Sequence, residues 1–405
     1  MASIEETTNA NSAAGARAMQ RDVANVAAAL VERAREVELN RRIPDEIFEM
    51  VRATGIYRIL QPARFGGYQG NPVDVIDAIF ELARSCPSTA WVAAICNVHQ
   101  WMVSGFTVAA QEDVWGENDE VLISGSYAPR GLAVLADGGI RLSGCWEFLS
   151  GCDNTSWAIV GLMVPSESDD APAHPNFALV PRVDYRIDDM WHAVGLAGSG
   201  SSNIYIDDVF VPAHRLVSIP SMTDGCSPGS KAHSHPLYRI PLLSLVPYII
   251  SIVGLGAAQG GYDAFTAQMR HRKGRGGVLD VSKSLASIPA VQTRIGEAAG
   301  YIDAGRLIIK TDLEKILATV NSGRNISVTK RIRCKRNQAV ATRMAVKAAT
   351  TLYEGAGGAG LLAANRVQRA WRDANAVARH GGLNWDVQMS LYGSHVLGLH
   401  PEVGY

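Results

Sequence analysis

The chain has 405 residues and nearly balanced charge, with 38 Lys and Arg against 39 Asp and Glu. This length suggests two or three domains, or one large one, and a core that needs no disulfide bonds. The hydrophobic fraction of 47% and charged fraction of 19% argue against a disordered chain and a multi-span membrane protein. The charge balance argues against nucleic acid as the main partner, because phosphate-binding domains usually carry a basic excess.

Two features indicate a cytoplasmic protein. The six cysteines form no CxxC pair and no dense framework, which is typical of reduced thiols, and residues 1–20 contain no apolar signal segment. Residues 241–262 are uncharged and long enough to cross a bilayer, but Pro247 interrupts them. We therefore expect a buried helix there and no membrane partner.

The hydrophobic period divides the chain into three regions. Apolar residues recur at helical spacing in 23–37, 73–83 and 89–103, and Pro44 opens a further helix. Short β-rich runs separated by Gly, Pro, Asp and Asn then predict an antiparallel β domain, followed by a loop and long helical patterns. This order predicts an α+β fold with three domains: helical (1–114), β (115–220) and helical (221–405).

Three familiar motifs lack their required context. The glycine-rich run 355–360 has no preceding strand and no following Lys-Ser or Lys-Thr, which favours a turn over a nucleotide loop. His233 and His235 have no carboxylate or Cys partner at ligand spacing, so we expect no metal site. A GxSxG nucleophile motif is absent.

Seven segments carry a family resemblance: RRIPDEIFEMVRATGIYRILQPARFGG (41–67), ARSCPSTAW (83–91), SGSYAPRG (124–131), WEFLSGCDNTSW (146–157), WHAVGLAGSGS (191–201), DVFVP (208–212) and QRAWRDANAVARH (368–380). In this order they resemble the acyl-CoA dehydrogenase fold. They are more closely similar to the oxygenase components of two-component flavin-dependent aromatic hydroxylases, such as the 4-hydroxyphenylacetate and steroid-degradation phenol hydroxylases. The resemblance implies an N-terminal helical domain, a central antiparallel β domain and a C-terminal four-helix bundle.

One position separates the two activities of this fold. Common acyl-CoA dehydrogenases place a catalytic Glu nine residues after the Arg of an RDA motif, and counting from Arg372 gives Gly381. A glycine cannot abstract a proton from an acyl thioester, and Glu354 of a YEG segment lies upstream, where it does not align. An acyl-CoA dehydrogenase or oxidase stays the alternative, because some members carry the Glu on another helix.

In the hydroxylases a His stands at the position of His380. A base with a pKa near neutral would make a phenol more reactive toward a flavin C4a-hydroperoxide. Arg372, Ala376 and His380 are spaced four residues apart, which predicts one helix face. The alternative for His380 is an ordinary core or surface histidine.

The resemblance implies further site residues, each with an ordinary structural alternative. Ser150 matches a Ser beside flavin N5, His99 a catalytic His at the substrate pocket, and Trp146 a residue packed along the flavin or substrate. Gly125 replaces a Ser of the relatives, so the substrate can differ or a neighbouring residue can substitute. The expected substrate contacts on this strand are Ser124, Ser126 and Tyr127. The other expected flavin contacts are Ser199, Ser201, Arg270 and Arg272, the arginines reaching a flavin phosphate across a subunit interface.

The resemblance thus implies a monooxygenase that uses O2 and diffusible reduced FMN or FAD to hydroxylate a small phenolic or indolic compound. Its expected partners are a separate NAD(P)H-dependent flavin reductase and three further copies of itself in a homotetramer. A non-enzymatic flavin-binding paralogue is a third hypothesis, which the presence of both Ser150 and His380 disfavours.

Overall fold

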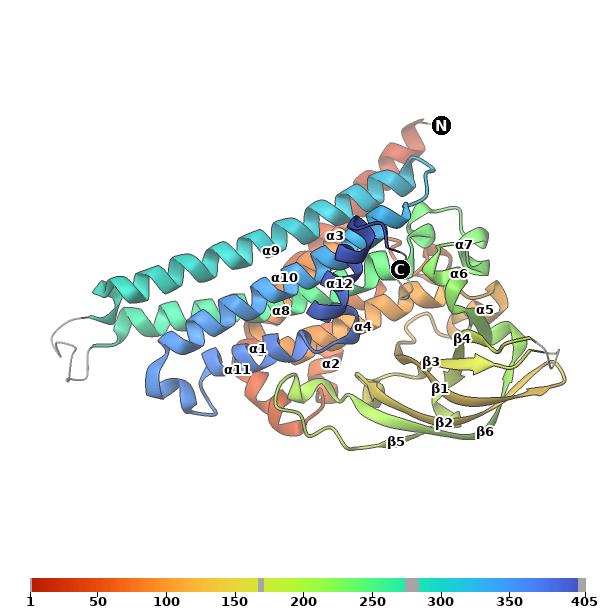
Figure 1. The fold of residues 1–405 in the computed structure, drawn as a ribbon, viewed down its shortest axis with the longest axis horizontal. Helices are drawn as coiled ribbons and strands as arrows, with labels where there is room; N and C mark the ends of the chain where they lie inside the picture. Colours follow the sequence, from red (N-terminus) through yellow and green to blue (C-terminus); the bar gives the residue numbers. More distant parts are fainter. Residues whose placement is uncertain (1, 167–170, 274–283, 400–405) are drawn as a thin grey trace.

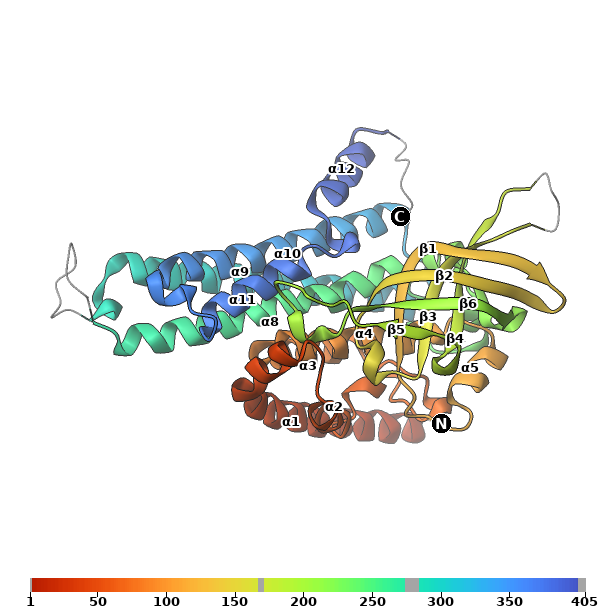
Figure 2. The ribbon, with the colours of Figure 1, turned by 90° about the horizontal axis from the view of Figure 1, so that it is seen from below.

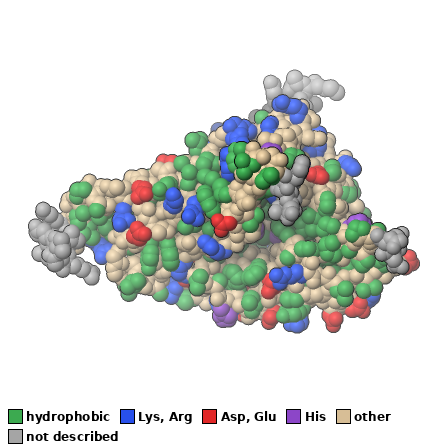
Figure 3. Space-filling view, viewed as in Figure 1, with side chains coloured by type: hydrophobic (Ala, Val, Ile, Leu, Met, Phe, Trp, Pro, Cys, Tyr) green, Lys and Arg blue, Asp and Glu red, His purple; other side chains and the backbone are tan. Residues whose placement is uncertain are grey.

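Two helical layers enclose one end of a β sheet (Figures 1 and 2). The structure is a computed structural model that describes residues 2–166, 171–273 and 284–399. The hydrophobic core of the helical layers is continuous from Met19 to Leu383, whereas the sheet has a second core of its own. Positive and negative side chains are interspersed on the face seen in Figure 3, in keeping with the balanced charge.

The N-terminal layer is built around one fully buried helix, α4 (Pro87–Val103). Helix α3 (Pro72–Ser85) precedes α4, and Asn71 caps it by accepting a hydrogen bond from the Val73 N–H at 2.8 Å. All residues of α4 are buried, which places the side chains of Trp91 and His99 inside the protein. The helices of this layer are α1 (Ala2–Asn40), α2 (Asp45–Arg52), α3 (Pro72–Ser85), α4 (Pro87–Val103) and α5 (Val108–Trp115).

The sheet has seven strands in the order β5-β6-β2-β1-β3-β4-β7. Every pair is antiparallel except β1 with β3, which is parallel, so the sheet is mixed where an antiparallel one was expected. The β1–β3 register shifts between Ser126 and Gly131, and the β2–β6 register shifts between Trp146 and Leu149. The strands are β1 (Ile123–Ala136), β2 (Gly139–Leu149), β3 (Trp157–Val164), β4 (His174–Pro181), β5 (Arg186–Asp188), β6 (Ser202–Pro212) and β7 (Leu216–Ser218).

The C-terminal layer is a bundle in which α8 packs against α9, α10 and α11, and against α3 and α4 of the first layer. Helix α8 is long and apolar enough to cross a membrane, but 89% of its most apolar window is buried inside the protein, which confirms a core helix. Helix α12 projects from the bundle (Figure 2). The helices are α6 (Ile219–Thr223), α7 (Pro228–Ala232), α8 (Leu242–His271), α9 (Pro289–Asn321), α10 (Val328–Gly355), α11 (Arg366–Val377) and α12 (Trp385–Val396).

Candidate active site

A cavity of about 570 Å³ lies where α4, the first two strands, the 191–201 loop, α8 and the turn after α11 meet. This volume is within the range of small-molecule sites, which are mostly apolar with a few convergent polar groups. The lining includes the aliphatic and aromatic residues Ile95, Phe148, Trp191, Leu196, Val246, Ile250 and Ala376 and the polar residues His99, Ser126, Tyr127, Ser150, Ser199, Ser201, Arg379 and His380.

Helix α4 presents Trp91, Ile95 and His99 to the cavity, because residues four apart share a helix face. The Nδ1 of His99 lies 2.8 Å from the carbonyl oxygen of Ile123, which can only accept, so Nδ1 carries the hydrogen. Burial lowers the pKa of His99 to about 4 and keeps the ring neutral. Its Nε2 is therefore an acceptor, and the Tyr127 hydroxyl donates to it at 2.9 Å.

Tyr127 reaches His99 because it lies in the β1–β3 register shift, and such bulges re-aim side chains. Gly125 leaves space for the contact: a Cβ there would lie 3.0 Å from His99 Nε2 and 2.9 Å from the Ile159 carbonyl oxygen. The structure thus sets the Tyr127 hydroxyl beside His99. Ser126 lines the cavity, whereas Ser124, expected to contact substrate, is fully buried and lies outside the lining.

Three serine hydroxyls form a hydrogen-bonded chain along one cavity wall. Trp91 donates from Nε1 to Ser150 Oγ at 2.8 Å. Ser150 Oγ lies 2.8 Å from Ser201 Oγ, which lies 2.7 Å from Ser199 Oγ. These residues come from α4, from the turn after β2 and from the 191–201 loop, and the predicted flavin contacts Ser150, Ser199 and Ser201 are thereby brought together.

The 191–201 loop is held from α11. Asp373 Oδ1 accepts a hydrogen bond from the Leu196 N–H at 2.7 Å, and Trp191 Nε1 donates to the Leu196 carbonyl at 3.1 Å. These bonds fix Leu196 at φ 49°, a left-handed conformation that a leucine rarely adopts. Gly195 is required for the close approach, because a Cβ there would lie 2.4 Å from the Arg372 carbonyl oxygen.

Asp373 should make stability fall as pH rises. Burial raises its pKa from 3.8 to about 6, so between these values the folded state holds a proton that the unfolded state has lost. The stabilising contribution is complete below the unfolded pKa and is lost as pH rises through about 6. Relative to wild type, Asp373→Asn should gain about 2 kcal/mol of unfolding free energy between pH 4 and pH 6.5. Urea unfolding at both pH values checks this, and a pH-independent difference would contradict it.

His380 lies beyond the end of α11, so the expectation that it extends a helix face with Arg372 and Ala376 is wrong. The helix ends at Val377, and the chain turns over Gly381 and Gly382, with His380 extended at φ −61° and ψ 133°. His380 still lines the cavity, with its ring edge-on to Trp91 at 5.9 Å between centroids.

The hydrogen bond to the His380 ring indicates that this side chain acts as a hydrogen-bond donor in the cavity, and not as the near-neutral base predicted from the sequence. Its Nδ1 accepts from the Gly382 N–H at 3.2 Å, which puts the hydrogen of the neutral ring on Nε2. Desolvation lowers the pKa of His380 to about 4, so this neutral form persists at physiological pH. The two cavity histidines are therefore opposite tautomers: His99 accepts through Nε2, and His380 donates through Nε2.

Three predicted cofactor residues lie away from the cavity in this chain. Trp146 is fully buried in the sheet core, donating to the Gly161 carbonyl at 2.7 Å, and its ring occupies space left by Gly131. Arg270 and Arg272 lie at the far end of α8, about 30 Å along the helix from Ile250 at 1.5 Å per residue. Arg272 donates to the Ala356 carbonyl at 3.2 Å.

Several lining residues were not singled out from the sequence. Trp91, Phe148 and Trp191 stand inside segments that carry the family resemblance, and Arg379 precedes His380 directly. Their position in those segments is the signal that could have marked them. Phe148 has φ 64° at the β2–β6 register shift, and its ring packs edge-on against Trp191 in the cavity lining.

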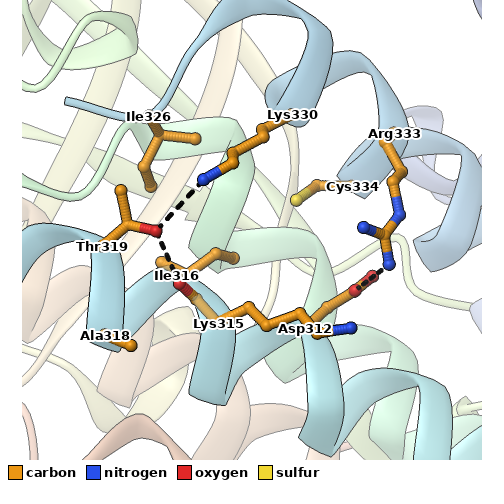
Figure 4. Close-up of a pocket in the computed structure, with 9 residues that line it drawn as sticks. All are labelled: Asp312, Lys315, Ile316, Ala318, Thr319, Ile326, Lys330, Arg333 and Cys334. Carbon is orange, nitrogen blue, oxygen red and sulfur yellow. Dashed lines mark hydrogen bonds and ion pairs between the residues drawn. The ribbon is translucent and has the colours of Figure 1, made fainter. Parts of the chain in front are cut away.

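A second cavity of about 190 Å³ lies between α9 and α10 (Figure 4). Several of its polar groups form hydrogen bonds and ion pairs with one another: Lys330 Nζ lies 3.4 Å from Thr319 Oγ1, and Arg333 Nη2 lies 3.1 Å from Asp312 Oδ1. None of the residues predicted for the site lines this cavity, whereas several of them line the larger one.

Comparisons with known proteins agree with this fold. The models "Acyl-CoA dehydrogenase, N-terminal domain" and "Acyl-CoA dehydrogenase, C-terminal domain" match residues 14–117 and 248–385. The FADH(2)-dependent resorcinol hydroxylase oxygenase component of Rhizobium sp. (strain MTP-10005) is 40% identical over 388 residues, covering 95% of each chain. The crystal structure of 3-HSA hydroxylase from Rhodococcus sp. RHA1 has a TM-score of 0.89 and 36% identity, covering 96% of this chain and 98% of that one. XiaF from Streptomyces sp., solved with FADH2 and glycerol, has a TM-score of 0.87 and 26% identity, covering 99% of each chain.

Fold and family models together define a protein of the acyl-CoA dehydrogenase type. Among the residues lining the described cavity, Glu147 is the sole carboxylate, and it is paired with Arg130. Glu354 lies on α10, outside the cavity, and pairs with Arg294 at 3.1 Å. An acyl-CoA dehydrogenase activity is therefore not favoured. The chain belongs to the oxygenase components of two-component flavin-dependent aromatic hydroxylases, and it is a flavin-dependent monooxygenase.

Proposed function

We propose that the cavity holds reduced FMN or FAD beside a small phenolic or indolic ring. One observation supports this proposal: polar groups of three kinds line one largely apolar cavity. They are the hydrogen-bonded pair of His99 and Tyr127, the Nε2 donor of His380, and the chain of serine hydroxyls. The volume suits an aromatic ring system, and the hydroxyls suit the polar ring edge of a flavin. The reduced flavin, when bound, supplies the electrons that activate O2.

In this proposal each polar group has one task. Tyr127 donates its hydroxyl hydrogen to His99 Nε2, so a lone pair of its oxygen can accept a hydrogen bond from a substrate hydroxyl and orient the ring. His380 donates from Nε2 to oxygen at the reacting position. Ser126 contacts the substrate, and Ser150, Ser199 and Ser201 contact the flavin.

The reduced flavin comes from a separate NAD(P)H-dependent reductase, and the protein works in the cytoplasm. The relative of Rhizobium sp. is named as an oxygenase component, which supports a separate reductase. The test is reconstitution with an unrelated NADH-dependent FMN reductase and a panel of resorcinol, 4-hydroxyphenylacetate and indole. Hydroxylated product that requires both proteins supports the proposal, and NADH consumption that yields hydrogen peroxide alone with every compound contradicts it.

The functional unit is a homotetramer in which a neighbouring copy supplies the phosphate contacts. Arg270 and Arg272 lie too far along α8 to reach a flavin in the cavity of their own chain. Helix α12 exposes the apolar side chains of Trp385, Val387 and Val396, which supports its burial against a second copy. Light scattering should give four times the 43.4 kDa mass of one chain.

Replacing both Arg270 and Arg272 by alanine should weaken flavin binding about tenfold or more, because each arginine can make charge-assisted bonds to phosphate. Fluorescence titration with FMN measures the dissociation constant. Arg324→Ala, in the turn between α9 and α10, is the matched control and should leave binding unchanged. Unchanged binding in the double variant would remove both arginines from the flavin site.

A further inference from the structure

The serine chain has a fixed number of protons. Trp91 Nε1 can only donate, so Ser150 Oγ accepts from it. Each of Ser150, Ser201 and Ser199 has one hydroxyl proton, and the two bonds between them use two of the three. One proton is therefore left for a ligand or solvent in the cavity that all three residues line.

The direction of the chain decides where this free proton lies. If Ser199 donates to Ser201 and Ser201 donates to Ser150, the free proton is on Ser150, which then acts as a donor. If Ser150 donates to Ser201 and Ser201 donates to Ser199, Ser150 has a free lone pair and acts as an acceptor. The two directions differ only by rotation of hydroxyl groups, because every proton stays on its own oxygen.

We propose that this chain reverses with the redox state of the bound flavin, so that Ser150 stays hydrogen-bonded to flavin N5 in both states. This inference rests on the proposed function. Among the flavin ring atoms, N5 suits such a reversible partner, because it is an acceptor in the oxidised ring and carries a hydrogen in the reduced ring. Ser201 and Ser199 are then positioning residues that act through Ser150, and Trp91 holds Ser150 in place in either state.

Ser201→Ala should discriminate between the redox states. With reduced flavin, Ser150 accepts from N5–H and from Trp91, and its own proton loses the Ser201 acceptor. With oxidised flavin, Ser150 donates to N5 and lacks only a bond at one lone pair. An unsatisfied buried donor costs more than an unused lone pair, so the variant should bind reduced flavin about tenfold more weakly relative to oxidised flavin. This corresponds to a midpoint potential about 30 mV lower for the bound flavin.

The control variants separate this effect from general damage. Trp91→Phe removes a bond that is present in both states, so the affinity ratio should stay within about twofold of wild type. Ser202→Ala changes a buried neighbour outside the cavity lining and should change neither affinity. Ser199→Ala should shift the ratio in the same direction as Ser201→Ala, and it replaces that variant if Ser201→Ala fails to fold by circular dichroism.

The experiment is anaerobic titration of each variant with oxidised and with dithionite-reduced FMN and FAD, together with the ¹⁵N chemical shift of N5-labelled FMN. The reversible chain is supported if the ratio of reduced-flavin to oxidised-flavin affinity changes in the Ser201 and Ser199 variants alone. The ¹⁵N chemical shift of N5 should then also change in both redox states of these variants. Equal ratios in wild type, Ser201→Ala and Ser199→Ala, with FMN still bound, would overturn it and leave the proposed function standing. If wild type binds neither FMN nor FAD in either state, both proposals fail.

Discussion

Replacing His380 by alanine should lower the rate of aromatic hydroxylation about 10²–10³-fold, the usual loss when a fixed donor to a reacting oxygen is removed. The reduced flavin should still be consumed by O2, so the missing product should appear as hydrogen peroxide. Product and peroxide measured in the same single-turnover reaction check this expectation. His395→Ala, at the end of α12 and outside the cavity lining, is the matched control and should keep wild-type product yield.

His380→Gln distinguishes a donor from a base. A glutamine amide can donate from about the position of Nε2 but cannot act as a base. If His380 donates, as its bond from Gly382 favours, glutamine should recover a large part of the activity lost in alanine. Equal loss in both variants would instead return His380 to the role of a base, and full activity in His380→Ala would remove it from the reaction.

Replacing Tyr127 by phenylalanine should lower hydroxylation of phenols about tenfold, the loss expected when one hydrogen bond that orients the substrate hydroxyl is removed. The change removes the oxygen that accepts a hydrogen bond from the substrate hydroxyl and leaves His99 Nε2 without its donor. Indole has no hydroxyl group to engage Tyr127, so its oxidation should be much less affected. The measurement is product yield for resorcinol and indole under identical reduced-flavin supply.

Tyr185→Phe is the control for Tyr127→Phe, because Tyr185 is also a buried tyrosine but belongs to the sheet core. It should leave the ratio of phenol to indole oxidation at the wild-type value. An equal loss for both substrates in Tyr127→Phe would indicate a packing role for this residue and contradict its role as an acceptor.

Local patterns in the sequence were sufficient to predict the order of helical, β and helical regions. The apolar run of 89–103 became the buried helix α4, and the uncharged run of 241–262 became the core of α8. The parallel pairing of β1 with β3 could not be predicted in this way, because alternation of side chains is the same in parallel and antiparallel strands. Two short helices, α6 and α7, likewise stand in a segment predicted as a loop.

The candidate site was likewise predicted from the sequence only in part. His99, Ser126, Tyr127, Ser150, Ser199, Ser201 and His380 line one cavity, although their roles stay predictions. Trp146 could not be excluded from the sequence, since its burial depends on space left by Gly131, a residue on another strand. The tautomers of His99 and His380 depend on the Ile123 carbonyl and the Gly382 N–H, which only the folded chain brings to the rings.

The origin of the oxygen atom in the product tests the monooxygenase reaction directly. The protein is mixed without oxygen with reduced FMN and resorcinol, ¹⁸O2 is admitted, and the product is analysed by mass spectrometry. A monooxygenase incorporates one oxygen atom from O2, so we expect a hydroxylated product with one ¹⁸O atom in wild type and a strongly reduced yield in His380→Ala. Unlabelled product, or hydrogen peroxide alone with resorcinol, 4-hydroxyphenylacetate and indole, would contradict it.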